Sequence, residues 1–64
     1  GVNLGVGYLG LARMRAGDPE GRAMFESALA GFSAQKAAHP EEELDADFGI
    51  SQLATAEART RSSS

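Results

Sequence analysis

Between Asp18 and Phe32 the apolar residues recur at the spacing of an α-helix. Four of them stand at positions i, i+3, i+4 and i+7, which share one side of a helix. They are Phe25, Ala28, Leu29 and Phe32. Asp18 can cap the N-terminus of this helix, and Pro19 suits its first position, where no N–H partner is needed. The stretch therefore predicts an amphipathic helix, and we expect the flanking segments to cover its apolar side.

The segment before it, residues 2–16, predicts a helix that is apolar on two sides. One side carries Leu4, Tyr8, Leu11 and Met14, and the other carries Val2, Val6 and Leu9. Such a helix needs a neighbour on each side. Gly17 suits the left-handed position that ends a helix. Because so short a break follows, residues 2–16 and the second helix, 19–38, are expected to form an antiparallel αα-hairpin.

A third helix is expected over residues 40–59. The residue before a proline disfavours the α conformation, so the second helix should end at His39, and Pro40 can open the next. Leu44 and Phe48 mark one apolar side of this helix, and Ile50 and Leu53 mark the other. The predicted fold is thus all-α, with a hairpin and a third helix within residues 1–59 and a disordered polar tail at 60–64.

Composition limits what this fold can do. The chain has 64 residues and no cysteine, so it forms one small domain with no disulfide or thiolate metal site. A net charge of −3 argues against nucleic acid as a partner. The apolar run over residues 2–12 is too short to span a membrane and lacks the basic start of a signal peptide. Because the chain begins at Gly1, we expect a piece of a larger, cytoplasmic protein.

A short internal match suggests a repeat. Leu9-Gly10-Leu11 followed by Met14 is echoed about 39 residues later by Phe48-Gly49-Ile50 followed by Leu53. A fixed period of this size is typical of helical repeat arrays. The shared glycine predicts close helix–helix approach at Gly10 and Gly49. Leucine at Gly10 should then overpack the contact, and we expect alanine there to be accommodated.

These residues resemble a tetratricopeptide-like repeat, of the longer kind found in bacterial transcriptional regulators and signalling ATPases. The resemblance lies in Leu9-Gly10, in Gly17-Asp18 and in Phe25 with Ala28-Leu29, and it spans about one and a half repeats. It implies that Phe48-Gly49 marks the middle of the next helix A. The full set of predicted packing positions is Leu9, Gly10, Phe25, Ala28, Leu29, Phe32, Leu44, Phe48 and Gly49.

Other motifs lack the context that their chemistry needs. The GxGxxG over residues 5–10 follows no strand, and Asp47-Phe48-Gly49 has no kinase catalytic loop before it. The carboxylates from Glu41 to Asp47 lack the glycine and closing glutamate of a calcium loop, and His39 is the one imidazole. We therefore expect no enzyme and no catalytic, cofactor or metal residues.

The expected function is a non-catalytic, protein- or peptide-binding scaffold segment of a larger regulatory protein, with no membrane partner. The resemblance places exposed helix A positions such as Asn3, Arg13 and Gln52 on the binding face. Alternatives are a helical subdomain that completes a catalytic or ligand site elsewhere, and a small self-assembling protein. We expect a homo-oligomer or a repeat array, because an isolated unit leaves apolar sides bare. The candidate interface residues are Val2, Val6, Leu9, Ile50 and Leu53.

Overall fold

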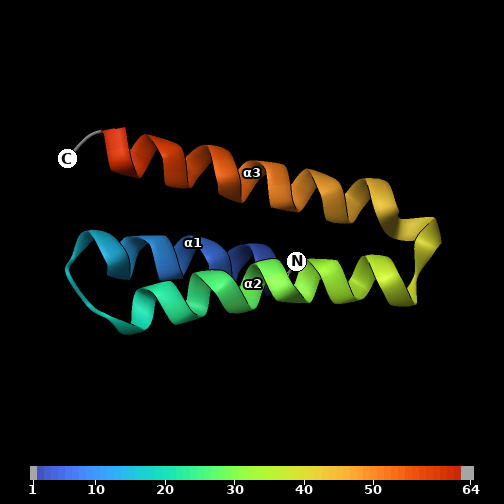
Figure 1. The fold of residues 1–64 in the computed structure, drawn as a ribbon, viewed down its shortest axis with the longest axis horizontal. Helices are drawn as coiled ribbons and strands as arrows, with labels where there is room; N and C mark the ends of the chain where they lie inside the picture. The colour runs from blue at the N-terminus through green and yellow to red at the C-terminus, as the bar shows by residue number, and fades with distance from the viewer. Residues whose placement is uncertain (1, 63–64) are drawn as a thin grey trace.

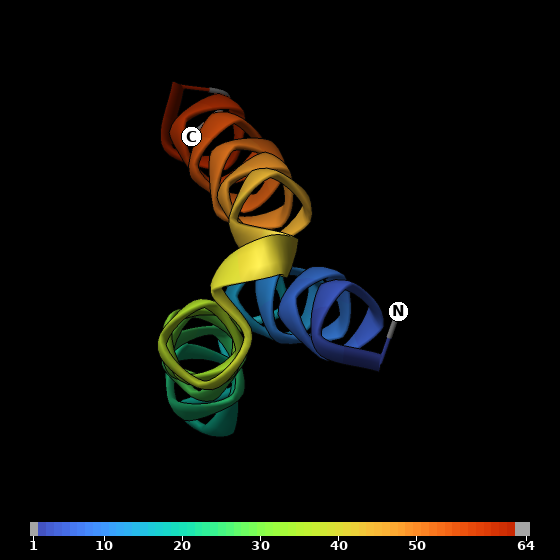
Figure 2. The same cartoon turned by 90° about the vertical axis from the view of Figure 1, so that its right-hand side faces the viewer.

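Three α-helices make up the described part of the chain. The computed structural model describes residues 2–62. In chain order these form α1 (Val2–Arg15), α2 (Glu20–Ala38), the short 3-10 helix η1 (Pro40–Glu42) and α3 (Glu43–Ser62). Figure 1 shows α1 and α2 as an antiparallel pair, with α3 returning in the direction of α1. Seen end-on in Figure 2, the start of α3 lies over the pair and its C-terminal end leans away; the helix contacts both α1 and α2. The predicted all-α hairpin with a third helix is confirmed.

The turn between α1 and α2 forms through the residues predicted for it. Gly17 takes the left-handed conformation, with φ of 83°. Its N–H donates to the carbonyl of Met14 (3.1 Å), and the N–H of Asp18 donates to that of Arg13 (2.9 Å). These two bonds satisfy carbonyls that the end of α1 leaves unpaired.

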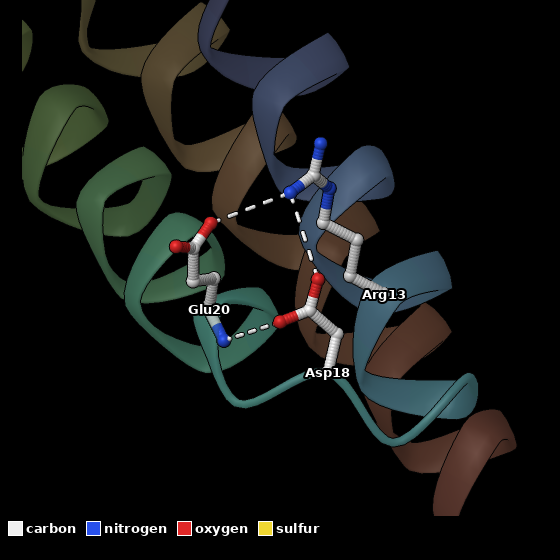
Figure 3. A network of polar contacts seen from close by, with 3 residues as sticks. All are labelled: Arg13, Asp18 and Glu20. Carbon is white, nitrogen blue, oxygen red and sulfur yellow. Dashed lines mark hydrogen bonds and ion pairs between the residues drawn. The ribbon is translucent and has the colours of Figure 1, made fainter.

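Asp18 then caps the second helix and joins it to the first. Its Oδ1 accepts a hydrogen bond from the N–H of Glu20 at 2.9 Å. Figure 3 shows Arg13 of α1 between two carboxylates, with Nη1 at 3.6 Å from Asp18 Oδ2 and 3.5 Å from Glu20 Oε2. The positive charge of Arg13 is therefore paired with the negative charges of Asp18 and Glu20 at the hairpin turn.

Glycine backbones let α1 and α2 touch. A Cβ at Gly10 would lie 2.7 Å from the nitrogen of Phe25 and 2.8 Å from the oxygen of Gly21. A Cβ at Gly21 would in turn lie 2.6 Å from the oxygen of Gly10. Since these neighbours are backbone atoms, neither position has room for a side chain. The structure places Gly10 at a close approach, but the expectation that alanine fits there is wrong.

The third helix docks through its small residues. A Cβ at Gly49 would overlap the ring of Phe32, and one at Gly7 would lie 2.5 Å from a methyl of Leu53. Gly49 and Ala46 are buried beside Leu53, one or two turns apart on α3. Within residues 2–62, the buried apolar side chains are Leu11, Phe25, Ala28, Phe32, Ala46 and Leu53. One core thus joins all three helices.

The prediction for the two apolar sides of α3 is wrong. Leu44 and Phe48, expected to pack, are 83% and 62% exposed, whereas Leu53, a candidate interface residue, is 0% exposed. The sequence pattern marks both sides as apolar. The side that carries Ala46 and Gly49 docks because small residues let the helix axes approach, and the bulkier side then faces outward.

The remaining predicted positions divide between core and surface. Val6 and Ile50, expected at an uncovered interface, are partly buried against the core, whereas Val2 and Leu9 are exposed. Leu9 had also been expected to pack. Among the other packing positions, Leu29 is partly buried, and Gly10, Phe25, Ala28, Phe32 and Gly49 are buried.

The third helix is longer than predicted. It continues through Ser62, so residues 60–62 are helical rather than a disordered tail. The hydroxyl of Thr60 donates to the carbonyl of Ala56 at 3.0 Å, and Arg61 pairs with Glu57 at 3.3 Å. Each of these contacts joins residues four positions apart, which is one helical turn. They accompany the continuation of the helix beyond its last apolar residue. Residues 63–64 of the predicted tail lie outside the described residues.

Candidate functional site

A groove opens between α1 and α3 near their C-terminal ends. Figure 1 shows α3 diverging from α1 toward its C-terminus, and the groove lies in the resulting wedge. It encloses about 470 Å³, within the usual range of ligand sites. The first helix contributes Tyr8, Leu11, Ala12 and Arg15, and the third contributes Gln52, Thr55, Ala56, Arg59 and Thr60. Leu11 is buried and forms the apolar floor.

The groove carries positive charge and no acidic side chain. Its two cations, Arg15 and Arg59, are exposed and form no ion pair with any residue among 2–62. Every other arginine or lysine in that part of the chain pairs with a carboxylate; these are Arg13, Arg22, Lys36 and Arg61. Both arginines that have no ion pair within residues 2–62 therefore line this one groove.

This arrangement is suited to binding an anion with apolar neighbours. A guanidinium presents several N–H donors in a planar fork that matches carboxylate oxygens. The ring of Tyr8 and the side chain of Leu11 offer apolar surface, and Gln52 adds an amide that can donate or accept. The lining residues include no histidine or carboxylate that could serve as a general base.

The opposite end of α3, its N-terminus, is acidic and is joined to α2 by ion pairs. Lys36 Nζ lies 3.0 Å from Asp47 Oδ1 and 3.6 Å from Glu43 Oε1. The hydrogen bond to Asp47 and its negative charge raise the pKa of the exposed Lys36 ammonium above its ordinary value. Gln35 Nε2 also donates to Glu42 Oε1 at 2.8 Å. These contacts explain much of the acidic cluster that the sequence shows in this region.

One group of side chains has donor atoms close enough for a cation. His39, Glu41 and Glu42 lie with their donor atoms within 4.8 Å of one another, because η1 folds them into one turn. His39 Nδ1 is 3.4 Å from Glu41 Oε2, and the Glu42 carboxylate already accepts from Gln35. His39 and Glu41 are exposed on the turn, as expected for an ordinary helix connection.

Of the three residues predicted for the binding face, one lines the groove and two lie elsewhere. Gln52 lines the groove. Arg13 is held in the hairpin turn, and the side chain of Asn3 lies against Gly31 of α2. Sequence reasoning missed Arg15 and Arg59. The parallel course of α1 and α3 would have suggested them, had the register between the two helices been known.

Comparisons with family models, with curated proteins and with solved structures found no match to this chain. Among the described residues, no helix combines the length and apolar character needed to cross a membrane.

Proposed function

We propose that this chain is a non-catalytic binding module whose α1–α3 groove holds an acidic peptide of a partner protein. The observation that carries the proposal is the pair of arginines, Arg15 and Arg59, that line an acid-free groove without forming ion pairs of their own. A carboxylate bound between them would gain charge-assisted hydrogen bonds. An apolar side chain beside it would cover the exposed ring of Tyr8.

The tetratricopeptide-like resemblance supports the same face. It equates α1 and α3 with the helices A of successive repeats, and helices A line the concave binding surface of such arrays. The groove is bounded by these two helices and by no residue of α2. On this proposal the chain acts as a scaffold segment of a larger regulatory protein. No feature of residues 2–62 favours the alternative of a subdomain that completes a catalytic site.

Fluorescence anisotropy with a labelled peptide tests the proposal. The probe is Glu-Leu-Glu-Glu-Leu-Glu, and its control is the same peptide with glutamine in place of glutamate. We expect only the acidic probe to bind, with an affinity that falls as salt is added. Arg15→Gln or Arg59→Gln should each raise its Kd about tenfold or more, because a charged hydrogen bond is lost.

Arg22→Gln is the matched control, since it removes the same charge from the exposed face of α2, where Arg22 pairs with Glu26 at 3.6 Å. This variant should bind the acidic probe like the parent chain. Equal binding of the neutral peptide would contradict the proposal. So would an affinity that Arg22→Gln lowers as much as Arg15→Gln does.

A further inference from the structure

An apolar patch with one carboxylate stands at the start of α3. We call Leu44, Asp45 and Phe48 the α3 patch. Leu44 and Phe48 are the most exposed large apolar side chains of this helix, and Asp45 lies between them in the chain and is also exposed. Leaving a leucine and a phenylalanine in water forgoes the gain of burying them. Leu44 and Phe48 stand one helical turn apart, so they form a continuous apolar surface of the kind that protein contacts cover.

Asp45 stands apart from the other carboxylates. It forms no ion pair or side-chain hydrogen bond with any residue among 2–62, although the chain places Lys36 close to its neighbours Glu43 and Asp47. Each remaining carboxylate of that part has a partner; these are Asp18, Glu20, Glu26, Glu41, Glu42, Glu43, Asp47 and Glu57. The α3 patch therefore combines a carboxylate that has no ion pair within residues 2–62 with exposed apolar surface.

The groove is the complement of this patch. It combines the unpaired positive charges of Arg15 and Arg59 with the exposed ring of Tyr8, which lies in the same groove as the buried Leu11. Within one chain the two surfaces cannot meet, because Asp45 and Arg59 belong to the same continuous helix, about 21 Å apart along its axis. They can meet only between two copies.

We propose that the α3 patch of one copy docks into the α1–α3 groove of a second copy. Phe48 and Leu44 pack on the exposed ring of Tyr8, and the Asp45 carboxylate pairs with the two arginines. A single contact leaves each copy with either a free patch or a free groove, which close on each other in a reciprocal dimer or bind further copies in a chain. The inference rests on the groove of the proposed function, for which the patch is a competing, self-supplied acidic segment.

Sedimentation velocity across micromolar to millimolar concentrations tests the contact with two variants that change exposed side chains. Phe48→Ser removes the patch and keeps the groove, and Arg59→Glu does the reverse. We expect the parent chain to associate as its concentration rises, into a closed dimer or longer species, and each variant alone to remain monomeric. An equimolar mixture of the two offers one intact patch and one intact groove. It should form a dimer and nothing larger.

Val2→Ser is the control, because Val2 is also a highly exposed apolar residue but lies outside the patch. It should associate like the parent chain, and circular dichroism should show the same helix content in all variants. A monomeric parent chain, a mixture that stays monomeric, or association that survives in either single variant would each overturn the inference.

The peptide titration separates this inference from the proposed function when it is run on Phe48→Ser, whose groove has no competing patch. Binding of the acidic probe by that variant, together with a monomeric parent chain, overturns self-association alone. Patch-dependent association without any probe binding overturns the partner-peptide proposal and supports the contact between copies.

Discussion

At the scale of single residues, the glycines decide how closely the helices pack. Gly10 and Gly21 face each other across the α1–α2 contact with no room for a Cβ, whereas a Cβ at Gly5 would meet nothing within 4 Å. The sequence indicates that Gly10 serves helix packing, because a glycine recurs at the same place, Gly49, in the internal match. It does not indicate that the neighbours would be backbone atoms, which cannot rotate away. That is why alanine was wrongly expected to fit.

The first prediction compares two glycines of the same helix. Gly10→Ala should lower the free energy of unfolding by about 1–3 kcal/mol, because the added methyl overpacks against the backbone of α2. Gly5→Ala should raise it by up to about 1 kcal/mol, since alanine favours the helix and meets no neighbour. Urea unfolding monitored by circular dichroism measures both. Two variants of equal stability would show that α1 and α2 do not touch at Gly10.

At the scale of elements, the side on which α3 docks is the feature that the sequence could not settle. The predicted hairpin is present because its signals are local: Gly17 ends α1, and Asp18 caps α2. The docking side of α3 depends on which of two apolar stripes fits the surface of the hairpin. Gly49 beside the ring of Phe32 supplies that fit, and no local pattern reveals it.

The second prediction follows from the docking side. Leu53→Ala should destabilise the fold by about 2–5 kcal/mol, because it leaves a cavity over Gly7. Leu44→Ala should change stability by less than about 0.5 kcal/mol in the monomer, since this side chain is exposed. Urea unfolding at low protein concentration separates the two. A larger effect at Leu44 than at Leu53 would mean that α3 docks through the opposite side.

The third prediction concerns the ion pair between Lys36 of α2 and Asp47 of α3. Because Asp47 raises the pKa of Lys36 in the folded chain above the ordinary value of 10.5, the charged pair favours folding at pH below 10.5. That contribution is lost as the pH rises through the raised pKa and the ammonium deprotonates. Lys36→Met should therefore be less stable than the parent chain at pH 7, by an amount that disappears at strongly alkaline pH.

Lys36→Arg is the control for this pH effect, because a guanidinium keeps its charge at alkaline pH. It should hold its advantage over Lys36→Met across the whole range. Guanidinium chloride would screen the pair, so urea unfolding at low salt is the suitable measurement. If the difference in unfolding free energy between the parent chain and Lys36→Met did not change with pH, the ion pair would not be what stabilises this contact.

At the scale of the whole molecule, a thin fold leaves much of its apolar surface outside. The described chain measures 37 × 20 × 14 Å, and its buried apolar residues are few. Domains of this size are marginally stable. We therefore expect partner contacts, from a peptide or a second copy, to add stability that grows with the logarithm of the partner's concentration above its Kd. The helices were predictable from the sequence, but the groove was not, because it arises from the divergence of α3 from α1.

The central claim is that α3 docks through Ala46, Gly49 and Leu53 and so leaves the groove and the α3 patch exposed. Nuclear Overhauser contacts, measured in a dilute sample, test this claim most directly. We predict contacts between the methyl groups of Leu53 and the α-protons of Gly7, and between the ring of Phe32 and the α-protons of Gly49. Contacts from the ring of Phe48 or the methyl groups of Leu44 to Phe32 of the same chain would contradict the account.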